Sequence, residues 1–305
     1  MSICLREMRL AGLASGRLAS LAVQAAVLEA ATTLKPGLVC MDTRGIHSDM
    51  DIRTLVASAF SLRVYFAQAV ECGRLHAEAD PGECLRRLRA LGRAAEKTMF
   101  AATGGVNTHK GLIFSQGLLC AAMGRLAVLR GAVCAAEVCA EVAVLAGGIV
   151  EQDLAPLRHT AGDEEARHGA GRGRTAGEAL YLRYGETGIR GEAEQGFPHA
   201  LMGLQMLWDA CARGEFNRAV LHTLLVLMAE IRDTNILWRG GPDKLRTIQT
   251  LARRVLELGG TDTPAGTMAL EELRNYCLAQ RLSPGGSADM LCLALFLYLV
   301  AQPER

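Results

Sequence analysis

The sequence lacks an excess of charge of either sign. Its 305 residues include 33 Lys and Arg against 32 Asp and Glu, which gives a formal net charge of +1. The arginines are scattered along the chain, so no basic tract marks a surface for nucleic acid. Half of the residues are hydrophobic, which is enough for a large core. The composition predicts a well-packed globular protein that has no nucleic-acid partner and binds only small anions.

Paired cysteine motifs are also missing. The ten cysteines form no C-x-x-C pair, and no His follows them at zinc-finger spacing. A disulfide framework is implausible at this length, and so many free thiols suit a reducing compartment. We therefore expect buried thiols that pack as small hydrophobes, and a cytoplasmic protein.

No segment at either end has the pattern of a membrane span. The apolar stretch 18–31 is interrupted by Gln24 and Glu29, and its apolar positions repeat with a helical period. The uncharged run 290–301 is too short to cross a bilayer. Both are predicted to be core helices, and no membrane partner is expected.

Alternating β-strand patterns are scarce, whereas helical periodicity dominates. Val138, Val142, Leu145 and Ile149, for example, recur at i, i+4, i+7 and i+11. No fixed-period repeat is present, which argues against a solenoid. The sequence predicts an all-α protein, a single multi-helix globular domain over residues 1–305, with a flexible loop in the glycine-rich segment 159–177.

The turn from Ala101 to Gly111 combines glycines with an amide, a hydroxyl, an imidazole and an ammonium group. It precedes a helical run, and helix N-termini bind anions. It is not a Walker A loop, because His109 precedes the lysine, Gly111 follows it, and no strand comes before. An ordinary connection between helices is the alternative. The candidate ligand-binding residues are Gly104, Gly105, Asn107, Thr108, His109 and Lys110.

A second polar segment combines Lys35-Pro-Gly-Leu-Val39 with Gly45-Ile-His-Ser-Asp-Met-Asp51. His47 and Asp49 lie just ahead of a helix that is predicted to begin near Asp51 or Ile52. Capping of this helix by Ser48 or Asp49 is one interpretation. The other is a carboxylate site for Mg²⁺ or for general-base catalysis.

Three more polar segments interrupt the helical pattern. The first is a glycine-punctuated turn at 187–198, the second follows an apolar helix at 233–241, and the third, at 282–289, precedes the uncharged run. In the second segment, an Asp-x-Asn pair can bind a cation or a sugar hydroxyl. A terminal cap of the preceding helix is its structural alternative. Together with the first two, these segments predict a shared polar pocket between helices. Their candidate residues are Arg190, Glu192, Asp233, Asn235, Arg239, Ser283, Gly285, Gly286, Ser287 and Asp289.

The five segments, in this order, resemble the motifs of the triphosphoribosyl-dephospho-CoA synthase family. The resemblance covers about residues 25 to 300. It rests on Lys35-Pro-Gly-Leu-Val39, Gly45-x-His47-x-Asp49-Met50, Thr103 to Gly111 with Ile113-Phe-Ser115, Arg190-Gly-Glu-Ala193, Asp233-Thr-Asn235 and Leu282 to Asp289. It implies an all-helical transferase that joins ATP to dephospho-CoA and releases adenine. The product is the prosthetic-group precursor for the acyl carrier protein of citrate lyase or malonate decarboxylase.

One motif departs from the family pattern. Many relatives continue Lys-Pro-Gly-Leu-Val with Asp, but this chain has Cys40 there and Asp42 two positions later. Either Asp42 replaces the family carboxylate or the site is altered.

The resemblance also implies roles for the candidate residues. His47, Asp49 and Asp233 are the predicted catalytic group, and Asp49, Asp233 and Asp289 are the predicted Mg²⁺ ligands. ATP and dephospho-CoA are the predicted substrates, and a homo-oligomer is an open option. The predicted substrate-binding residues are Lys35, Gly37, Gly104, Gly105, Asn107, Thr108, His109, Lys110, Arg190, Glu192, Asn235, Arg239, Ser283, Gly285, Gly286 and Ser287.

Two alternatives belong to other functional classes. One is a Mg²⁺-dependent all-α hydrolase of nucleotides or ADP-ribose, in which water replaces the second substrate. The other is an inactive family member that acts as a helical binding protein.

Overall fold

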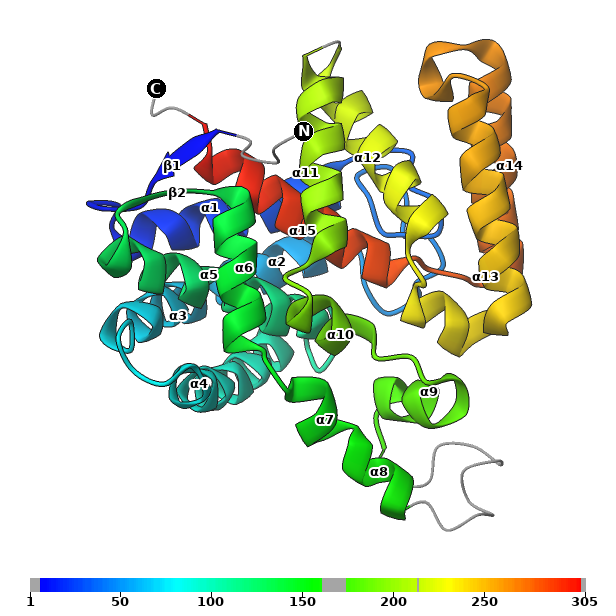
Figure 1. Ribbon diagram of the computed structural model, residues 1–305. Coiled ribbons are helices and arrows are strands. Elements are labelled where there is room, and N and C mark those ends of the chain that lie inside the picture. Colours follow the sequence, from blue (N-terminus) through cyan, green and yellow to red (C-terminus); the bar gives the residue numbers. More distant parts are fainter. Residues whose placement is uncertain (1–5, 161–173, 213, 303–305) are drawn as a thin grey trace.

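The computed structural model describes residues 6–160, 174–212 and 214–302, and nearly all regular structure in these ranges is helical (Figure 1). The elements are β1 (Glu7–Arg9), α1 (Ser15–Ala31), α2 (Ile52–Ser61), α3 (Arg63–Leu75), α4 (Pro81–Ala102), α5 (Lys110–Leu129), β2 (Ala132–Cys134), α6 (Ala135–Leu145), α7 (Ile149–Asp153), α8 (Ala155–Thr160), α9 (Ala176–Tyr184), α10 (Gly188–Glu194), α11 (Pro198–Cys211), α12 (Phe216–Glu230), α13 (Thr234–Glu257), η2 (Gly260–Asp262), α14 (Pro264–Gln280) and α15 (Gly285–Val300).

The predicted all-α class is confirmed, with one small addition. β1 and β2 form an antiparallel pair in which Met8 lies opposite Val133. Both side chains are buried. The pair holds the segment before α1 against the connection between α5 and α6.

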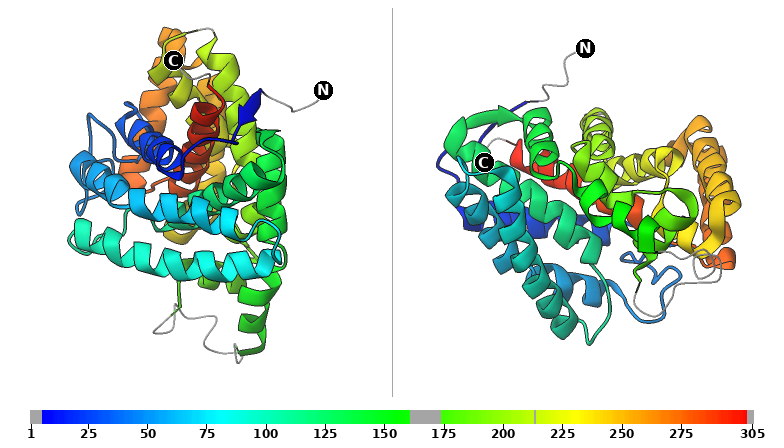
Figure 2. Two further views of the ribbon diagram at one scale, coloured as in Figure 1. Left: turned by 90° about the vertical axis from the view of Figure 1, so that its left-hand side faces the viewer. Right: turned by 60° about the horizontal axis from the view of Figure 1, so that its bottom comes forward.

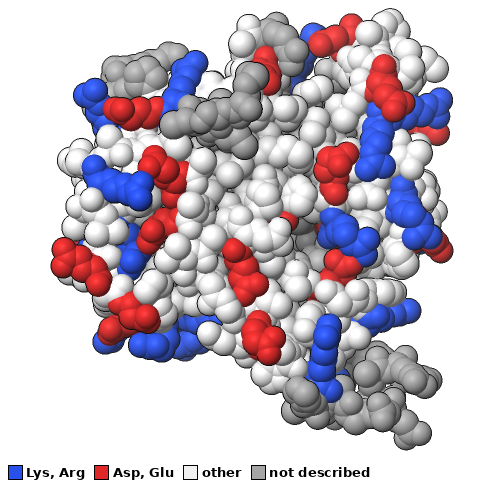
Figure 3. Space-filling model, in the orientation of Figure 1, with Lys and Arg blue, Asp and Glu red and all other residues white. Residues whose placement is uncertain are grey.

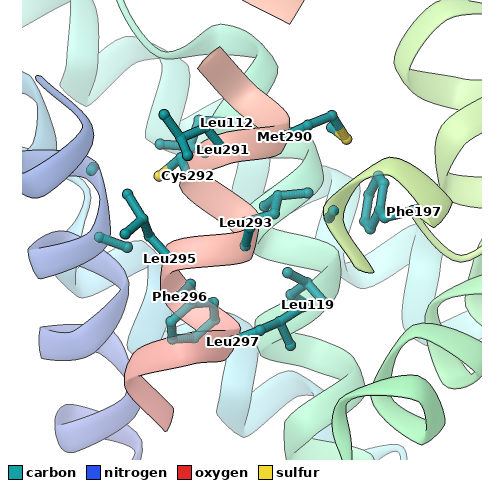
Figure 4. Packing of buried hydrophobic residues seen from close by; sticks show 14 of the residues in the cluster. Leu112, Leu119, Phe197, Met290, Leu291, Cys292, Leu293, Leu295, Phe296 and Leu297 are labelled. Carbon is teal, nitrogen blue, oxygen red and sulfur yellow. The ribbon is translucent and has the colours of Figure 1, made fainter. Parts of the chain in front are cut away.

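Helix α15 is the centre of the core. It packs against α1, α5, α11 and α12, and the ribbon views show it enclosed by helices on several sides (Figures 1 and 2). Leu291, Leu293 and Phe296 project from different sides of α15, and all three are buried (Figure 4). A helix that is apolar all round is stable only in such an interior position. The prediction that the run 290–301 is a core helix is confirmed.

Helix α5 packs unusually close to α3. Gly124 lies on the backbone of Val70, and Gly73 lies on the backbone of Ala121, so that a Cβ at either glycine would overlap a carbonyl oxygen. In the described ranges, α5 is also the one helix long and apolar enough to cross a membrane, but 78% of its apolar window is buried inside the protein. Such burial is typical of a core helix.

The helix starting after the second polar segment was predicted near Asp51 or Ile52, and it begins at Ile52. Its cap is Asp51, however, and not Ser48 or Asp49. The Asp51 carboxylate accepts from the backbone N–H of Thr54, and the Thr54 hydroxyl completes a capping box. His47 and Asp49 therefore lie outside the helix and do not cap it.

Two segments predicted as turns have different structures. The segment 187–194 is mostly the short helix α10, which begins at Gly188. Asp233 does not end α12 but caps the start of α13. Arg239 lies inside α13, just before a kink at Gly241 (φ 74°) and Pro242. Glycine takes the positive φ at little cost, and proline cannot continue the hydrogen-bond ladder.

The predicted loop 159–177 overlaps a helix at each of its ends. Helix α8 continues to Thr160, and α9 already begins at Ala176. Residues 161–173, at the centre of the prediction, lie outside the described ranges.

Candidate functional site

A cavity of about 760 Å³ opens beside the N-terminal end of α15. Its size is in the range of small-molecule sites. Residues from all five polar segments line it, although these segments lie far apart in the sequence. Their lining members are Leu38, Val39, Ile46 to Met50, Asn107 to Gly111, Gly188, Ile189, Glu192, Asp233 to Asn235, Arg239, Ser283, Gly285, Gly286, Ala288 and Asp289.

Three long helices begin at this cavity. The first turns of α5, α13 and α15 all contribute lining residues. Helix N-termini carry partial positive charge and free N–H groups, so they attract anions. Four cationic side chains join them in the lining: Lys110, Arg232, Arg239 and Arg281. Lys110 also pairs with Glu96 at 3.1 Å, and Arg232 pairs with Glu186.

Glycines let these segments approach one another closely. A Cβ on Gly111 would overlap Oδ2 of Asp289, and a Cβ on Gly285 would lie 2.7 Å from Nδ2 of Asn235. Gly37 is buried against the backbone of Leu282, below the cavity lining. These glycines therefore shape the site through close packing, and they do not need to bind a ligand themselves.

Asp233 joins two of the converging helices. One carboxylate oxygen accepts from the backbone N–H groups of Asn235 (2.9 Å) and Ile236 (3.3 Å). The other accepts from the backbone N–H (2.8 Å) and the hydroxyl (3.0 Å) of Ser287 in α15. Asp233 is 1% exposed, and burial raises the pKa of its carboxyl while these hydrogen bonds oppose the rise. Its acceptor capacity is used inside the protein.

Replacement of Ser287 by Ala should weaken this connection. The buried carboxylate would lose one of its four hydrogen bonds, and we expect the free energy of unfolding to fall by about 1 to 2 kcal/mol. Urea denaturation followed by circular dichroism measures the change. Ser61→Ala is a matched control, because the Ser61 hydroxyl bonds only within its own helix end. Equal stability of the Ser287→Ala protein and the wild type would contradict this role for Asp233.

Asp289 differs from Asp233 in having free acceptor capacity. Its half-buried carboxylate lines the cavity beside Gly111, and it has no hydrogen bond or ion pair with any described residue. Burial and the nearby Asp233 and Glu29 carboxylates raise the pKa of Asp289 to about 8. The group is therefore mostly protonated at neutral pH and can donate a proton.

His47 also lines the cavity. Its Nε2 is 3.2 Å from the hydroxyl of Ser283, and its Nδ1 is 3.8 Å from Oδ1 of Asp49. The second distance is too long for a hydrogen bond but permits charge attraction. Burial and the charge of Arg239 lower the pKa of His47, and Asp49 partly opposes them. His47 is therefore a neutral imidazole that can accept a proton.

His109 has a fixed orientation at the start of α5. Its Nδ1 lies 2.7 Å from the Ser58 hydroxyl, which in turn lies 2.6 Å from the hydroxyl of Thr108. Burial and the charge of Lys35 lower the pKa of His109 to about 4. The neutral ring presents the cavity with a hydrogen-bonding group but carries no charge for a phosphate.

Lys35, predicted to bind substrate, is only 1% exposed and is not part of the lining. Its ammonium group donates to the side chain (2.5 Å) and the backbone carbonyl (2.6 Å) of Glu29. Glu29, and not Lys35, lines the cavity and can contact a ligand there. Lys35 neutralises a carboxylate beneath the site and does not reach a ligand in this arrangement.

Four other predicted binding residues also lie outside the lining. Arg190 pairs with Asp153 at 3.0 Å, and Ser287 is buried against Asp233. Gly104 and Gly105 form the exposed tip of their turn, where φ values of 65° and 89° require glycine. The other predicted binding residues are in the lining, apart from the buried Gly37 and Lys35 described above.

Several residues at the site were not predicted from the sequence. Glu29 and Ser58 lie inside α1 and α2, and each falls on the buried side of its helix. A polar residue on an apolar helical stripe is a usable signal for both. Arg232 and Arg281 carried no comparable signal, because each directly adjoins a motif without belonging to it.

Cys40, which departs from the family motif, is buried and does not line the cavity. Asp42 lies close to it, since its carboxylate accepts from the Leu34 backbone N–H at 3.4 Å and helps to raise the pKa of the Cys40 thiol. Asp42 thus lies beside Cys40, but it does not line the cavity either, and its carboxylate pairs with Arg274 at 3.5 Å.

The structure offers no preformed all-protein metal site in the described ranges. No cluster there unites three or more His, Cys, Asp or Glu side chains in a geometry that could hold a metal ion. Of the predicted Mg²⁺ ligands, Asp233 is fully hydrogen-bonded, Asp289 is mostly protonated, and Asp49 is 58% exposed. Mg²⁺ commonly binds one or two carboxylates together with substrate phosphates, and Asp49 fits that mode.

Comparison with known proteins adds three findings. The family described as ATP:dephospho-CoA triphosphoribosyl transferase matches residues 15–305. A protein of Albidiferax ferrireducens, named "Probable 2-(5''-triphosphoribosyl)-3'-dephosphocoenzyme-A synthase", is 42% identical over 288 residues, which cover 94% of this chain and 90% of the relative. A crystal structure from Archaeoglobus fulgidus, described as a "putative triphosphoribosyl-dephospho-coA synthase", matches with a TM-score of 0.47 and 17% identity, over 81% of this chain and 98% of that one.

Proposed function

The chain belongs to the ATP:dephospho-CoA triphosphoribosyl transferase family, and on this premise we propose how its cavity performs the reaction. The enzyme transfers the triphosphoribosyl group of ATP to dephospho-CoA. The ribose 2′-hydroxyl of dephospho-CoA forms a new bond to the anomeric carbon of ATP, the bond from that carbon to adenine breaks, and adenine leaves. The product is a prosthetic-group precursor.

The meeting of three helix N-termini at one cavity is the observation that carries the proposal. Both substrates are polyanions, and α5, α13 and α15 direct positive partial charge at the space they share. Lys110 and Arg239 add full charges at the same lining. These groups hold the phosphates. Positioning of two reactants in register lowers the activation free energy of such a displacement by up to roughly 7 to 11 kcal/mol.

Asp289 is the proton donor to the departing adenine. A purine leaves more readily once one of its ring nitrogens is protonated, and Asp289 carries a proton at neutral pH because its pKa is about 8. After the proton leaves, the Asp289 carboxylate lies near the sugar. Its negative charge then stabilises the positive charge that develops at the anomeric carbon, as carboxylates do in glycoside hydrolysis.

His47 accepts the proton of the attacking hydroxyl. Its lowered pKa keeps the ring neutral at physiological pH, and Ser283 and Asp49 orient it from two sides. Asp233, for which a catalytic role was predicted, instead holds α13 and α15 in register and so positions Asp289 two residues beyond Ser287.

Mg²⁺ would bind together with the triphosphate of ATP. The exposed carboxylate of Asp49 is the protein group that would hold it, and the ion would neutralise part of the phosphate charge. The catalytic steps assigned to Asp289 and His47 do not depend on it.

The decisive experiment is incubation of the protein with ATP, Mg²⁺ and dephospho-CoA. We expect free adenine and the coupled product in equal amounts, measured by chromatography and mass spectrometry. A second incubation without dephospho-CoA separates the transferase from a nucleotide hydrolase, which would release adenine there as well. Absence of both products from a folded sample would contradict the proposal.

We place the reaction in the cytoplasm. All nine cysteines in the described part of the chain are free, which suits a reducing compartment.

Charges of both signs intermix on the face in Figure 3, in keeping with the predicted absence of a nucleic-acid partner.

A further inference from the structure

Glu192 is a carboxylate whose two oxygens have different surroundings. Its Oε1 accepts a hydrogen bond from Nδ1 of His199, in α11, at 2.5 Å. Its Oε2 is buried and, among the described residues, has no hydrogen-bond partner. Glu192 lines the cavity, and its side chain is 19% exposed. A buried carboxylate oxygen without a partner is costly, so its persistence points to a ligand that supplies a donor.

His199 holds this carboxylate in place through the hydrogen bond to Oε1. The hydrogen bond to Glu192 and the charges of Glu192 and Glu230 raise the pKa of His199, although burial opposes them. In this geometry the imidazole donates its Nδ1 proton to Oε1, and Oε2 is left without a hydrogen bond from any described residue. A carboxylate oxygen accepts hydrogen bonds, so Oε2 needs an N–H or O–H group from a ligand.

The position of Glu192 indicates which part of a substrate supplies that donor. A phosphate would be repelled by the carboxylate, and Lys110 and Arg239, to which we assign the phosphates, come from other helices, α5 and α13. Ile189 lines the cavity one helical turn before Glu192, on the same side of α10. An apolar side chain next to a buried acceptor suits a flat, uncharged ring that carries an amine.

We propose that Glu192 accepts a hydrogen bond from the exocyclic amine of a 6-aminopurine and thereby determines base specificity, with His199 as its positioning residue. The inference rests on the proposed function, in which both ATP and dephospho-CoA bring a 6-aminopurine. A 6-oxopurine would present an oxygen to the carboxylate and be repelled. A purine without a substituent at this carbon would leave Oε2 unpartnered.

The test compares ligands with and without the amine. Calorimetry gives the Kd of ATP and of purine riboside 5′-triphosphate, which lacks only the amine. A second pair consists of dephospho-CoA and its analogue with purine in place of adenine. For the wild type, we expect the amine to strengthen binding roughly 10- to 100-fold in one of the two pairs. The pair that shows the preference identifies the substrate whose base Glu192 contacts.

Two variants assign this preference to Glu192. Glu192→Leu removes the acceptor and should reduce the preference to about twofold or less. Glu192→Gln keeps the shape, retains a neutral acceptor and should lower the preference about three- to tenfold. Thermal unfolding shows whether the Leu variant is folded. If it is not, the Gln variant still tests whether Glu192 causes the preference. Glu186→Gln is the control, because Glu186 lines the same cavity but already pairs with Arg232, and the preference should persist.

His199→Asn tests the positioning role. The loss of the imidazole should reduce the preference for the amine about as much as Glu192→Gln does. The affinity for the analogue without the amine should change little. A merely structural role would instead weaken both members of the pair equally.

The proposal is overturned if the wild type binds both members of each pair equally, or if its preference survives in the Glu192 variants. Both results are obtained from binding alone. They are therefore distinct from a failure of the proposed transfer reaction, which would appear as absence of adenine release by the wild type.

Discussion

Replacement of Asp289 by Asn is expected to lower kcat for adenine release by about 100- to 1,000-fold. The amide keeps the shape of the side chain but cannot donate its proton to the departing purine, and general-acid catalysis contributes about that much. The variant should bind ATP nearly as well as the wild type, because the reaction loses proton transfer and not the phosphate contacts. Single-turnover release of adenine and calorimetric binding of ATP measure the two quantities separately.

The pH dependence identifies the acid. Asp289 must be protonated to act, and its pKa is about 8, so the wild-type rate should fall as pH rises through about 8. His47 must be neutral to act, so the rate should also fall once pH drops below its lowered pKa. The Asp289→Asn variant should lose the alkaline decline and keep the acid one. An unchanged alkaline decline in the variant would assign that decline to another group.

The same variant should be more stable than the wild type at alkaline pH. The pKa of Asp289 is raised on folding from its ordinary value of 3.8 to about 8, so folding favours the protonated form. The stability that this carboxyl contributes is present below about pH 4 and is lost as pH rises to about 8. We therefore expect Asp289→Asn to raise Tm above the wild-type value by about 2 °C or more at pH 8, and to change it little at pH 4. These are the two conditions for differential scanning calorimetry.

Lys35→Met is expected to destabilise the fold by about 3 to 5 kcal/mol. The change leaves the Glu29 carboxylate, whose side chain is only 10% exposed, without its ammonium partner, and removal of one member of a buried ion pair has a cost of this size. Urea denaturation provides the measurement. Arg274→Met is a suitable control, since Arg274 also pairs with carboxylates, Asp42 and Glu271, but does so near the surface.

A second change separates lost charge from lost packing. Glu29→Gln combined with Lys35→Met removes both charges, and most of the lost stability should return, because replacement of a whole buried pair by neutral groups is often nearly free of cost. A double variant as unstable as Lys35→Met would show that the stem of Lys35, and not its charge, stabilises this region.

The sequence predicted the helical class well because helical periodicity is local. The run 290–301 was recognisable as a core helix from its length and lack of charge, and α15 confirms it. Helix ends were predicted less well. Asp233 was interpreted as ending one helix although it begins the next, because Asp is common in turns and the choice depends on the direction of the chain afterwards.

Membership in the candidate site could be predicted more readily than the role of each residue. The five polar segments were recognisable because glycine and polar side chains interrupt apolar periodicity. Burial could not be deduced in the same way. Lys35 and Asp233 belong to motifs that resemble binding sites, but only three-dimensional packing shows that Glu29 and Ser287 already satisfy them. The raised pKa of Asp289 likewise depends on carboxylates from other helices.

The central position of α15 also governs how this chain can fold during synthesis. The helix at residues 285–300 is the one against which α1, residues 15–31, buries part of its apolar face, so some 250 intervening residues must be translated first. At about 5 to 20 residues per second, the partial chain would remain with an incomplete core for at least about ten seconds. Until α15 emerges from the ribosome, the parts of α1, α5 and α11 that pack on α15 stay uncovered, although α3 and α12 already cover other sides of these helices, and the uncovered parts are natural targets for chaperones. The cavity, which needs the first turn of α15, forms in that last step, so an unfinished chain cannot bind or consume ATP there.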